Sequence, residues 1–254
     1  MATQALAIPK DSTVLVTGLT GYIASHVAKQ LFANGYKVRG TVRDLSKAAW
    51  LKDEIFAREN AAGRLELVEV PDLGVPGAFT SAVKGVSGIA HLATIANWDP
   101  NPDNVIPQTV QGAVSILEAA AAEPSVARVV YTSTAGTAVM PVPGVQGHIG
   151  RDSWNDVAVQ AANAPPPYEA TRGMMTYMAS KVEAERAVWR FVEDKKPKFA
   201  VNVISPFTTL GPINHKTHLR GTAGWIDQLA RGDTSQIAML PACKWPPPNR
   251  DLEL

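Results

Sequence analysis

Short runs of β-branched and aliphatic residues alternate with longer segments of helical periodicity from Thr13 onward. This alternation is typical of repeated βαβ units, in which parallel strands are joined by crossover helices. We expect strands at residues 13–17, 37–42, 65–70, 88–93, 127–132 and 200–204. Because these runs are rich in Val, Ile and Leu without alternation, both faces of the sheet should be covered. The pattern predicts an α/β fold with a doubly wound parallel sheet.

Three segments have the spacing or length of crossover helices. Between the first two strands, Ile23, Val27 and Leu31 recur every fourth residue, and Gly35 follows as a left-handed stop. Longer helices are expected over residues 103–122 and 176–193.

Two regions have weaker patterns. Residues 136–172 are rich in Pro, Gly and Asn, so we expect an irregular excursion at the strand ends, where such loops shape sites. The pattern also weakens after residue 204, and residues 241–254 are expected to be loop. We expect one domain, 1–254, with the elements of a substrate lobe within 136–172 and 206–254.

The composition restricts partners and location. A net charge of +1, with charged residues at 19%, does not supply the basic field that nucleic acid or anionic membranes require. The sequence contains neither a secretory leader nor an apolar run of bilayer length, and the single Cys243 lacks neighbours for a disulfide or metal site. We expect a cytoplasmic protein with a small-molecule substrate; the sequence does not indicate an oligomeric state.

The segment 16–24, Val-Thr-Gly-Leu-Thr-Gly-Tyr-Ile-Ala, follows the first strand and opens the first helix. Gly18 permits a tight turn, and Gly21 lets a pyrophosphate approach the helix N-terminus. Ala24 stands where a third glycine would allow close packing of helix and strand. The alternative is a glycine-rich turn without a ligand.

Basic residues follow the second strand, where an NAD enzyme would place a carboxylate. Arg43 can bind a 2′-phosphate through two hydrogen bonds, and Lys47 adds positive charge. The alternative is that both are solvated surface residues.

Tyr177 and Lys181 are four residues apart in an expected helix, so they share one face. A nearby ammonium lowers the pKa of a phenol, which would make Tyr177 a better acid at neutral pH. Ser133 and Thr134 bring hydroxyls to the end of the fifth strand, where ligands of open α/β sheets bind. The alternatives are a surface pair on the helix and a strand-end cap.

Other residues are open or set aside. We interpret His91 as a core residue, because a lone strand histidine is more often buried and satisfied than catalytic. Trp98, Trp154 and Trp225 either line a pocket or cover the edges of the core.

Taken together, these motifs resemble the extended short-chain dehydrogenase/reductases, and within them the dihydroflavonol-reductase-like branch that includes fungal and yeast aldehyde and carbonyl reductases. The likeness runs from the first strand to about Leu240. It is carried by Thr17-Gly18-x-x-Gly21-Tyr22-Ile23-Ala24, Val38-Arg39-Gly40-Thr41-Val42-Arg43, His91-Leu92-Ala93-Thr94, Tyr131-Thr132-Ser133-Thr134-Ala135-Gly136 and Tyr177-x-x-x-Lys181.

The resemblance implies a Rossmann-type fold and an NADP(H) cofactor. The implied cofactor-binding residues are Gly18, Gly21, Tyr22, Ile23, Arg43, Lys47, Asp72, Ala93, Thr94, Tyr177, Lys181 and Pro206. Asp72 is implied near the adenine, Ala93 and Thr94 along the ribose and nicotinamide side, and Pro206 beside the nicotinamide.

The same resemblance implies a catalytic serine, the second of a pair, whose position here is occupied by Thr134. Because a threonine hydroxyl can do the same work, Thr134 is the first choice and Ser133 the second. Members of this family continue past the position of Pro241 into a further strand and a closing lobe. We therefore expect a small, truncated substrate lobe in this chain.

The expected function is NADPH-dependent reduction of an aldehyde or ketone to an alcohol. Two alternatives are an NAD-dependent nucleotide-sugar epimerase or dehydratase, against which Arg43 argues, and a non-catalytic NADP-binding sensor.

Overall fold

A computed structural model of the chain describes residues 6–140, 142, 146 and 148–235. It contains a six-stranded sheet in the order β3-β2-β1-β4-β5-β6, with every neighbouring pair parallel. The strands are β1 (Thr13–Val16), β2 (Lys37–Val42), β3 (Leu65–Glu69), β4 (Gly88–His91), β5 (Arg128–Thr132) and β6 (Ala200–Ile204). The order reverses direction between β1 and β4, which creates a switch point at the carboxyl edge of the sheet. The predicted doubly wound sheet is confirmed.

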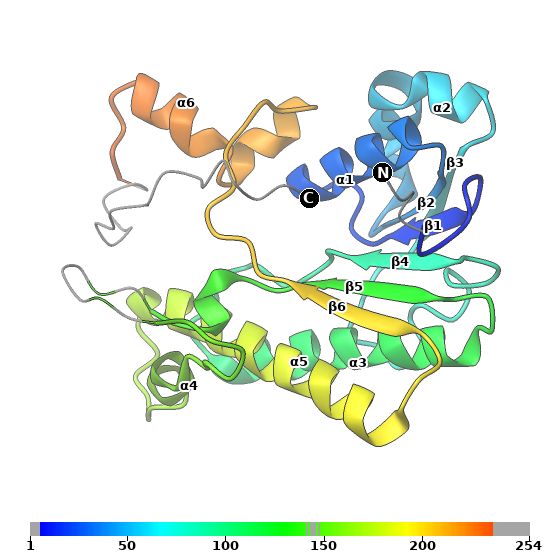
Figure 1. Ribbon diagram of the computed structural model, residues 1–254. Coiled ribbons are helices and arrows are strands. Elements are labelled where there is room, and N and C mark those ends of the chain that lie inside the picture. The colour runs from blue at the N-terminus through cyan, green and yellow to red at the C-terminus, as the bar shows by residue number, and fades with distance from the viewer. Residues whose placement is uncertain (1–5, 141, 143–145, 147, 236–254) are drawn as a thin grey trace.

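Helices cover the two faces of this sheet (Figure 1). One face carries α1 (Tyr22–Ala33), a π-helical segment (Leu51–Ile55) and α2 (Ala57–Ala61). The opposite face carries α3 (Ile106–Ala122) and α5 (Gly173–Lys195), which pack against each other. Gly35 adopts a φ of +88°, so the predicted left-handed stop after α1 is confirmed.

Neighbouring residues of β1 supply two separate cores. Leu15 packs with Ile89, Ile116 and other residues on the side of α3 and α5. Val16 packs with Leu19, Phe32 and other residues on the side of α1 and α2. Since successive side chains of a strand point to opposite faces, a strand buried on both faces has no polar alternation. This explains the continuous apolar runs of the central strands.

The expectation that every strand is covered on both faces is wrong for the edge strand β6. Val201 and Val203 pack toward the core, whereas Ala200, Asn202 and Ile204 are exposed. A strand at the edge of the described sheet has a neighbour on only one side, and the helices cover only one of its faces.

Three described α-helices, α2, α4 and α6, lie where the sequence analysis did not place a helix. Within residues 136–172, α4 (Asp156–Ala162) begins at Asn155, whose side chain caps the Ala158 amide at 3.1 Å, so this region is not wholly irregular. α6 (Gly224–Ala230) follows the chain's return from β6. The predicted loop at 241–254 and Cys243 lie outside the described residues. None of the helices described is long and apolar enough to cross a bilayer; a cytoplasmic location stays a prediction.

The start of α5 packs directly on the backbone of an earlier loop. A Cβ added at Gly173 would lie 2.3 Å from the carbonyl oxygen of Trp98. Because this neighbour is backbone, it cannot move by changing a rotamer. Glycine at this position therefore lets the loop that carries Trp98 contact α5.

We expect Gly173→Ala to lower the free energy of unfolding by about 1–2 kcal/mol, because overpacking against backbone outweighs the gain in helix propensity. Urea denaturation measures this change. Gly150→Ala is the control, since its Cβ would meet no atom closer than 3.9 Å and should change stability by less than about 0.5 kcal/mol. An equal effect of the two substitutions would contradict the argument.

Candidate active site

The glycine turn is held tightly against the end of β4. Gly18 adopts a φ of +67°, and a Cβ there would lie 3.2 Å from the Cα of Ala93. The Thr17 hydroxyl accepts hydrogen bonds from the amides of Leu92 and Ala93, each at 2.9 Å. Only glycine combines this φ with so close an approach. The turn after β1 and the Ala93 segment therefore lie together at one edge of the sheet.

The N-terminus of α1 lies in this turn without a protein cap. Gly21 is the N-cap residue, so no side chain accepts a hydrogen bond there, and the first helical turn contains no acidic residue. A Cβ on Gly21 would lie 3.1 Å from the carbonyl oxygen of Gly18. Uncapped amides and the helix dipole favour an anion at this position. The cradle formed by Gly18, Gly21, Tyr22 and Ile23 fits a diphosphate group.

The basic residues after β2 differ in their surroundings. Arg43 is exposed, and no carboxylate within the described part of the chain pairs with it. Lys47 is also exposed but forms an ion pair with Asp44 at 3.0 Å. Hydrogen bonding from Ser46, followed by Lys47, lowers the pKa of Asp44 to about 2. Of these two basic residues, Arg43 is therefore the one without a carboxylate partner in the described part of the chain and can bind an anionic ligand.

Asp72 stands on the same side of the sheet, just beyond β3. Its carboxylate is exposed and accepts a hydrogen bond from the Gly74 amide at 2.8 Å. This contact shapes the turn after the strand and leaves the second carboxylate oxygen available.

Lys181 is buried beneath the end of β5, with only 2% of the residue exposed. Its ammonium donates to the Thr132 carbonyl at 2.8 Å and to the Tyr131 hydroxyl at 3.2 Å. Burial lowers the pKa of Lys181 to about 8, partly opposed by Glu185. This lysine is an anchored internal cation and not half of a solvated surface pair.

Tyr177 lies one helical turn earlier on α5. Burial raises its pKa above the ordinary value, so the lowered pKa expected from the sequence is wrong for the chain without a ligand. The ammonium of Lys181 is engaged by Thr132 and Tyr131, and removal of the phenol from water is the dominant effect. Tyr177 therefore keeps its proton at neutral pH.

The two candidate hydroxyls after β5 have different environments. Ser133 is 5% exposed, and its hydroxyl oxygen has no hydrogen-bond partner among the residues that the structure describes. The Thr134 hydroxyl accepts a long hydrogen bond from the Gly136 amide at 3.4 Å and caps a short 3₁₀ turn. Because side chains alternate along extended backbone, Ser133 shares the face of Tyr131, whose hydroxyl contacts Lys181. The strand-end cap foreseen as an alternative applies to Thr134.

Pro206 lies at the same edge, beyond β6. Its carbonyl accepts a hydrogen bond from the Ala135 amide at 2.9 Å, and the Ile204 carbonyl accepts from the Ser133 amide at 2.8 Å. The chain leaving β6 is thus tied to the segment that carries both hydroxyls. Thr94, at the end of the β4 segment, has a buried hydroxyl oxygen with no partner among the described residues.

Trp98 lies beside Tyr177, with 5.0 Å between the ring centroids. Its backbone has a left-handed φ of +56°, and 51% of the residue is exposed. The loop is also held by the Thr176 hydroxyl, which donates to the Pro100 carbonyl at 3.1 Å. Of the tryptophans left open by the sequence, Trp98 is the one that contacts the predicted catalytic pair, whereas Trp154 packs against Arg186.

His91 is a buried core residue, as interpreted from the sequence. Its Nδ1 lies 3.1 Å from the Thr17 hydroxyl, and its ring packs between Phe79 and Tyr131. Burial lowers its pKa to about 3, so it is neutral.

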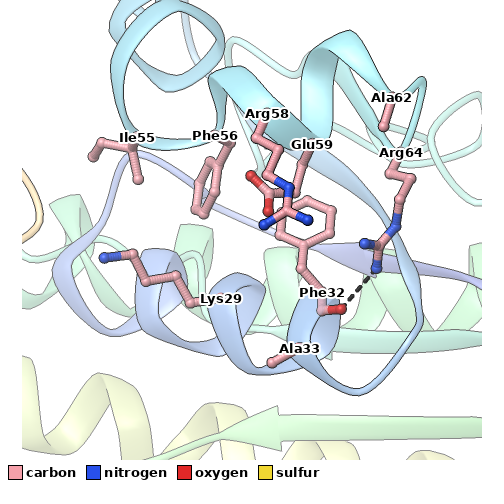
Figure 2. A pocket seen from close by; sticks show the side chains of 9 residues that line it. All are labelled: Lys29, Phe32, Ala33, Ile55, Phe56, Arg58, Glu59, Ala62 and Arg64. Carbon is pink, nitrogen blue, oxygen red and sulfur yellow. Dashed lines mark hydrogen bonds between the residues drawn. The ribbon is translucent and has the colours of Figure 1, made fainter.

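A pocket of about 460 Å³ lies away from these residues, between the carboxyl end of α1 and α2 (Figure 2). Phe32 and Phe56 form its apolar side, and Arg64 donates to the Phe32 carbonyl at 2.7 Å. None of the predicted site residues lines this pocket. It lies at the opposite end of α1 from the glycine turn.

Sequence reasoning placed residues 211–218 within the expected substrate lobe but did not predict that they return over α1. Gly211 lies against the Tyr22 hydroxyl, and the Pro212 carbonyl lies 2.9 Å from Nε2 of His26. The residues in contact are almost two hundred positions apart in the sequence, so no local pattern predicts these contacts.

Comparisons with known proteins agree with this geometry. Residues 14–244 match the family described as "NAD dependent epimerase/dehydratase family". The chain is 41% identical over 226 residues to the NAD-dependent epimerase/dehydratase terH of Aspergillus terreus, covering 89% of this chain and 66% of that protein. It is 39% identical over 237 residues to aldehyde reductase 2 of Sporidiobolus salmonicolor, covering 92% of this chain and 68% of that protein. The chain thus spans about two thirds of the length of these relatives.

Among solved structures, the chain is similar to yeast methylglyoxal/isovaleraldehyde reductase complexed with NADPH, with a TM-score of 0.66 and 26% identity. That similarity covers 79% of this chain and 59% of the reductase.

The burial of Lys181 predicts a specific pH dependence of stability. The folded-state pKa of about 8 lies below the ordinary 10.5, so the unfolded chain binds more protons between these values. The free energy of unfolding of the wild type should therefore rise relative to Lys181→Met, by up to about 3 kcal/mol, as pH increases from 8 to 10.5.

Chemical denaturation at several pH values measures this difference. Lys84→Met, which removes an exposed ammonium, is the control for general alkaline titration. A constant difference between wild type and Lys181→Met across the window would show that Lys181 is not a strained buried cation.

Proposed function

We propose that this chain, which belongs to the NAD dependent epimerase/dehydratase family and thus to the extended short-chain dehydrogenase/reductases, reduces an aldehyde or ketone to an alcohol with NADPH. The observation that carries this proposal is a buried group at the end of β5. There Lys181 contacts Tyr131, Tyr177 lies one turn away on α5, and the Ser133 hydroxyl lacks a partner among the described residues.

The arrangement of the glycine turn supports a dinucleotide as cofactor. Gly18 and Gly21 leave the uncapped N-terminus of α1 open to a diphosphate, and Ala93 and Thr94 continue the same edge of the sheet. Arg43, an exposed cation in the position where an NAD enzyme has a carboxylate, supports NADPH over NADH. The similar yeast reductase is itself complexed with NADPH.

In this mechanism NADPH, when bound, supplies the hydride that is added to the carbonyl carbon. Tyr177 transfers its phenolic proton to the carbonyl oxygen, so that the product is an alcohol and Tyr177 recovers its proton from solvent. The raised pKa of Tyr177 supports this role, because the residue begins the reaction as the acid. The ammonium of Lys181, fixed by Thr132, stabilises the phenolate that remains.

We assign the orientation of the carbonyl oxygen to Ser133 before Thr134, which reverses the order expected from the sequence. The Ser133 hydroxyl is buried and unpartnered in the described part of the chain, on the face that carries Lys181. An unpartnered buried hydroxyl is costly unless a ligand satisfies it. The Thr134 hydroxyl accepts from the Gly136 amide in the cap of the following turn, so the ranking rests on the unpartnered burial of Ser133.

The substrate side is proposed to include Trp98 and elements within 136–172 and 206–254. Trp98 offers an exposed aromatic surface next to Tyr177. α4 packs against α5. A planar or aromatic substituent on the carbonyl substrate would stack on Trp98.

Tyr177→Phe should reduce NADPH oxidation with a panel of aldehydes and ketones by at least about a hundredfold, because the proton donor is lost. NADPH binding, measured by fluorescence titration, should persist. Tyr36→Phe, at the other end of α1, is the matched control and should leave turnover unchanged.

Two results would redirect this proposal. Full activity of Tyr177→Phe would refute the assigned mechanism. A wild type that binds NADPH but turns over no carbonyl would favour the sensor, and one that purifies with tightly retained NAD would favour an epimerase or dehydratase.

Ser133→Ala and Thr134→Ala should differ. We expect Ser133→Ala to lower kcat/KM about ten- to a thousandfold, since it removes the donor to the carbonyl oxygen. Thr134→Ala should cost less than about tenfold in kcat/KM and mainly lower stability through the lost cap. Steady-state kinetics with thermal melts separate the two effects; the opposite ranking would return the role to Thr134.

A further inference from the structure

The chain beyond β6 returns to the N-terminal half of α1 and is fastened there. Asn214 donates to the Ser25 hydroxyl at 2.9 Å and also accepts a hydrogen bond from Lys29. The Pro212 carbonyl contacts His26. These contacts hold a 3₁₀ turn, Lys216–Arg220, close to the glycine turn (Figure 1).

A cluster of aromatic side chains packs this 3₁₀ turn against α1. The His218 ring lies 5.8 Å from the ring of Tyr22, which is the first residue of α1. Trp50 lies 5.9 Å from His218 and stacks on His215 at 4.1 Å with an interplanar angle of 5°. His218 is therefore enclosed between the beginning of α1 and the segment after β2.

The imidazole of His218 is a buried polar group whose hydrogen bonding is incomplete. The residue is 4% exposed, and neither ring nitrogen has a hydrogen-bond partner among the described residues by distance and angle. The Thr20 backbone, which belongs to the glycine turn itself, approaches the ring as a weak hydrogen-bond acceptor and favours the protonated imidazole. The Thr20 backbone can satisfy only one of the two ring nitrogens, so the other is buried without a partner among the described residues. Such burial costs free energy, and such sites commonly mark a ligand or a functional group.

We infer that His218 is a further residue of the cofactor site, and that its imidazole takes up a proton when the diphosphate of NADPH binds at the N-terminus of α1. This inference rests on the proposed function. It makes His218 a positioning residue, which acts through the Thr20 turn and by its charge.

The surroundings of His218 determine the direction of the effect. Burial lowers its pKa below the ordinary 6.5; the Thr20 backbone opposes this, and His215 and His26 reinforce it. Charged groups on the packed elements include Lys29 on α1 and, in the segment after β2, Glu54, whose carboxylate lies 4.0 Å from His215. The same segment carries Lys52 and Asp53, and Lys216 and Arg220 flank His218 in sequence. Without a ligand His218 is neutral at pH 7.

A bound diphosphate favours the imidazolium, so His218 has a higher pKa in the complex than in the free protein. NADPH affinity should therefore increase as the pH falls through the pKa that His218 has in the complex. It should level off below the pKa that His218 has in the free protein. Each pKa unit of difference corresponds to a factor of up to about ten in affinity.

The test compares wild type, His218→Gln and His215→Gln by calorimetric titration with NADPH between pH 6.5 and 8, in buffers of different ionisation enthalpy. Glutamine keeps a donor for the Thr20 backbone but cannot titrate in this range. We expect net proton uptake by the wild type and about three- to tenfold tighter binding at pH 6.5 than His218→Gln shows. His215→Gln alters the same segment, but Nδ1 of His215 already contacts Thr217, so proton uptake should persist.

Adenosine 2′-monophosphate is the second probe, because it carries the 2′-phosphate without the diphosphate. Its binding should show no difference in proton uptake between wild type and His218→Gln. Equal proton uptake by these two proteins with NADPH, or none in the wild type, would overturn the inference even if a variant folded poorly. Failure of the wild type to bind NADPH would overturn the proposed function as well. Proton uptake without carbonyl turnover would leave this inference standing and reject only the reductase proposal.

Discussion

The close contact between the glycine turn after β1 and the end of β4 is the constraint on which the site depends. Gly18 reaches the backbone of Ala93 because it has no Cβ, and the Thr17 hydroxyl binds two amides of the same segment. This contact aligns the N-terminus of α1 with the switch point of the sheet. Without it, an anion bound at α1 would not face the residues that follow β4 and β5.

A second constraint is the buried ammonium of Lys181. A cation that is removed from water needs hydrogen-bond acceptors in the protein. The Lys181 ammonium donates to the Thr132 carbonyl and to the Tyr131 hydroxyl. These bonds fix α5 against the end of β5, and Tyr177 lies one helical turn before Lys181 on the same helix. The same burial that strains the lysine keeps Tyr177 protonated, so one apolar environment prepares both groups for the proposed proton transfer.

The two sides of the proposed cofactor site differ in how they are built. The glycine turn, Arg43 and Asp72 follow consecutive strands and form the part nearest the N-terminus of the chain. Trp98, Pro206 and His218 come from loops that return to this edge from distant positions. The Trp98 backbone can pack on α5 because Gly173 has no side chain. His218 is positioned by aromatic contacts with Tyr22 and Trp50. These loops are where relatives on the same scaffold can differ in substrate.

By itself, the sequence determined the parallel sheet, the crossover helices and the positions of the glycine turn and the Tyr177–Lys181 pair. Hydrophobic periodicity and the backbone requirements of turns depend on neighbouring residues, so the sequence shows them directly. The order of the family motifs along the chain adds further information. The unpartnered burial of the Ser133 hydroxyl among the described residues, the raised pKa of Tyr177 and the exposed face of β6 were decided only by the tertiary structure. The helices α2, α4 and α6 and the burial of His218 were likewise decided by the tertiary structure. Burial and hydrogen-bond partners depend on segments far apart in the chain, and no local pattern specifies which of two adjacent hydroxyls is left without a partner.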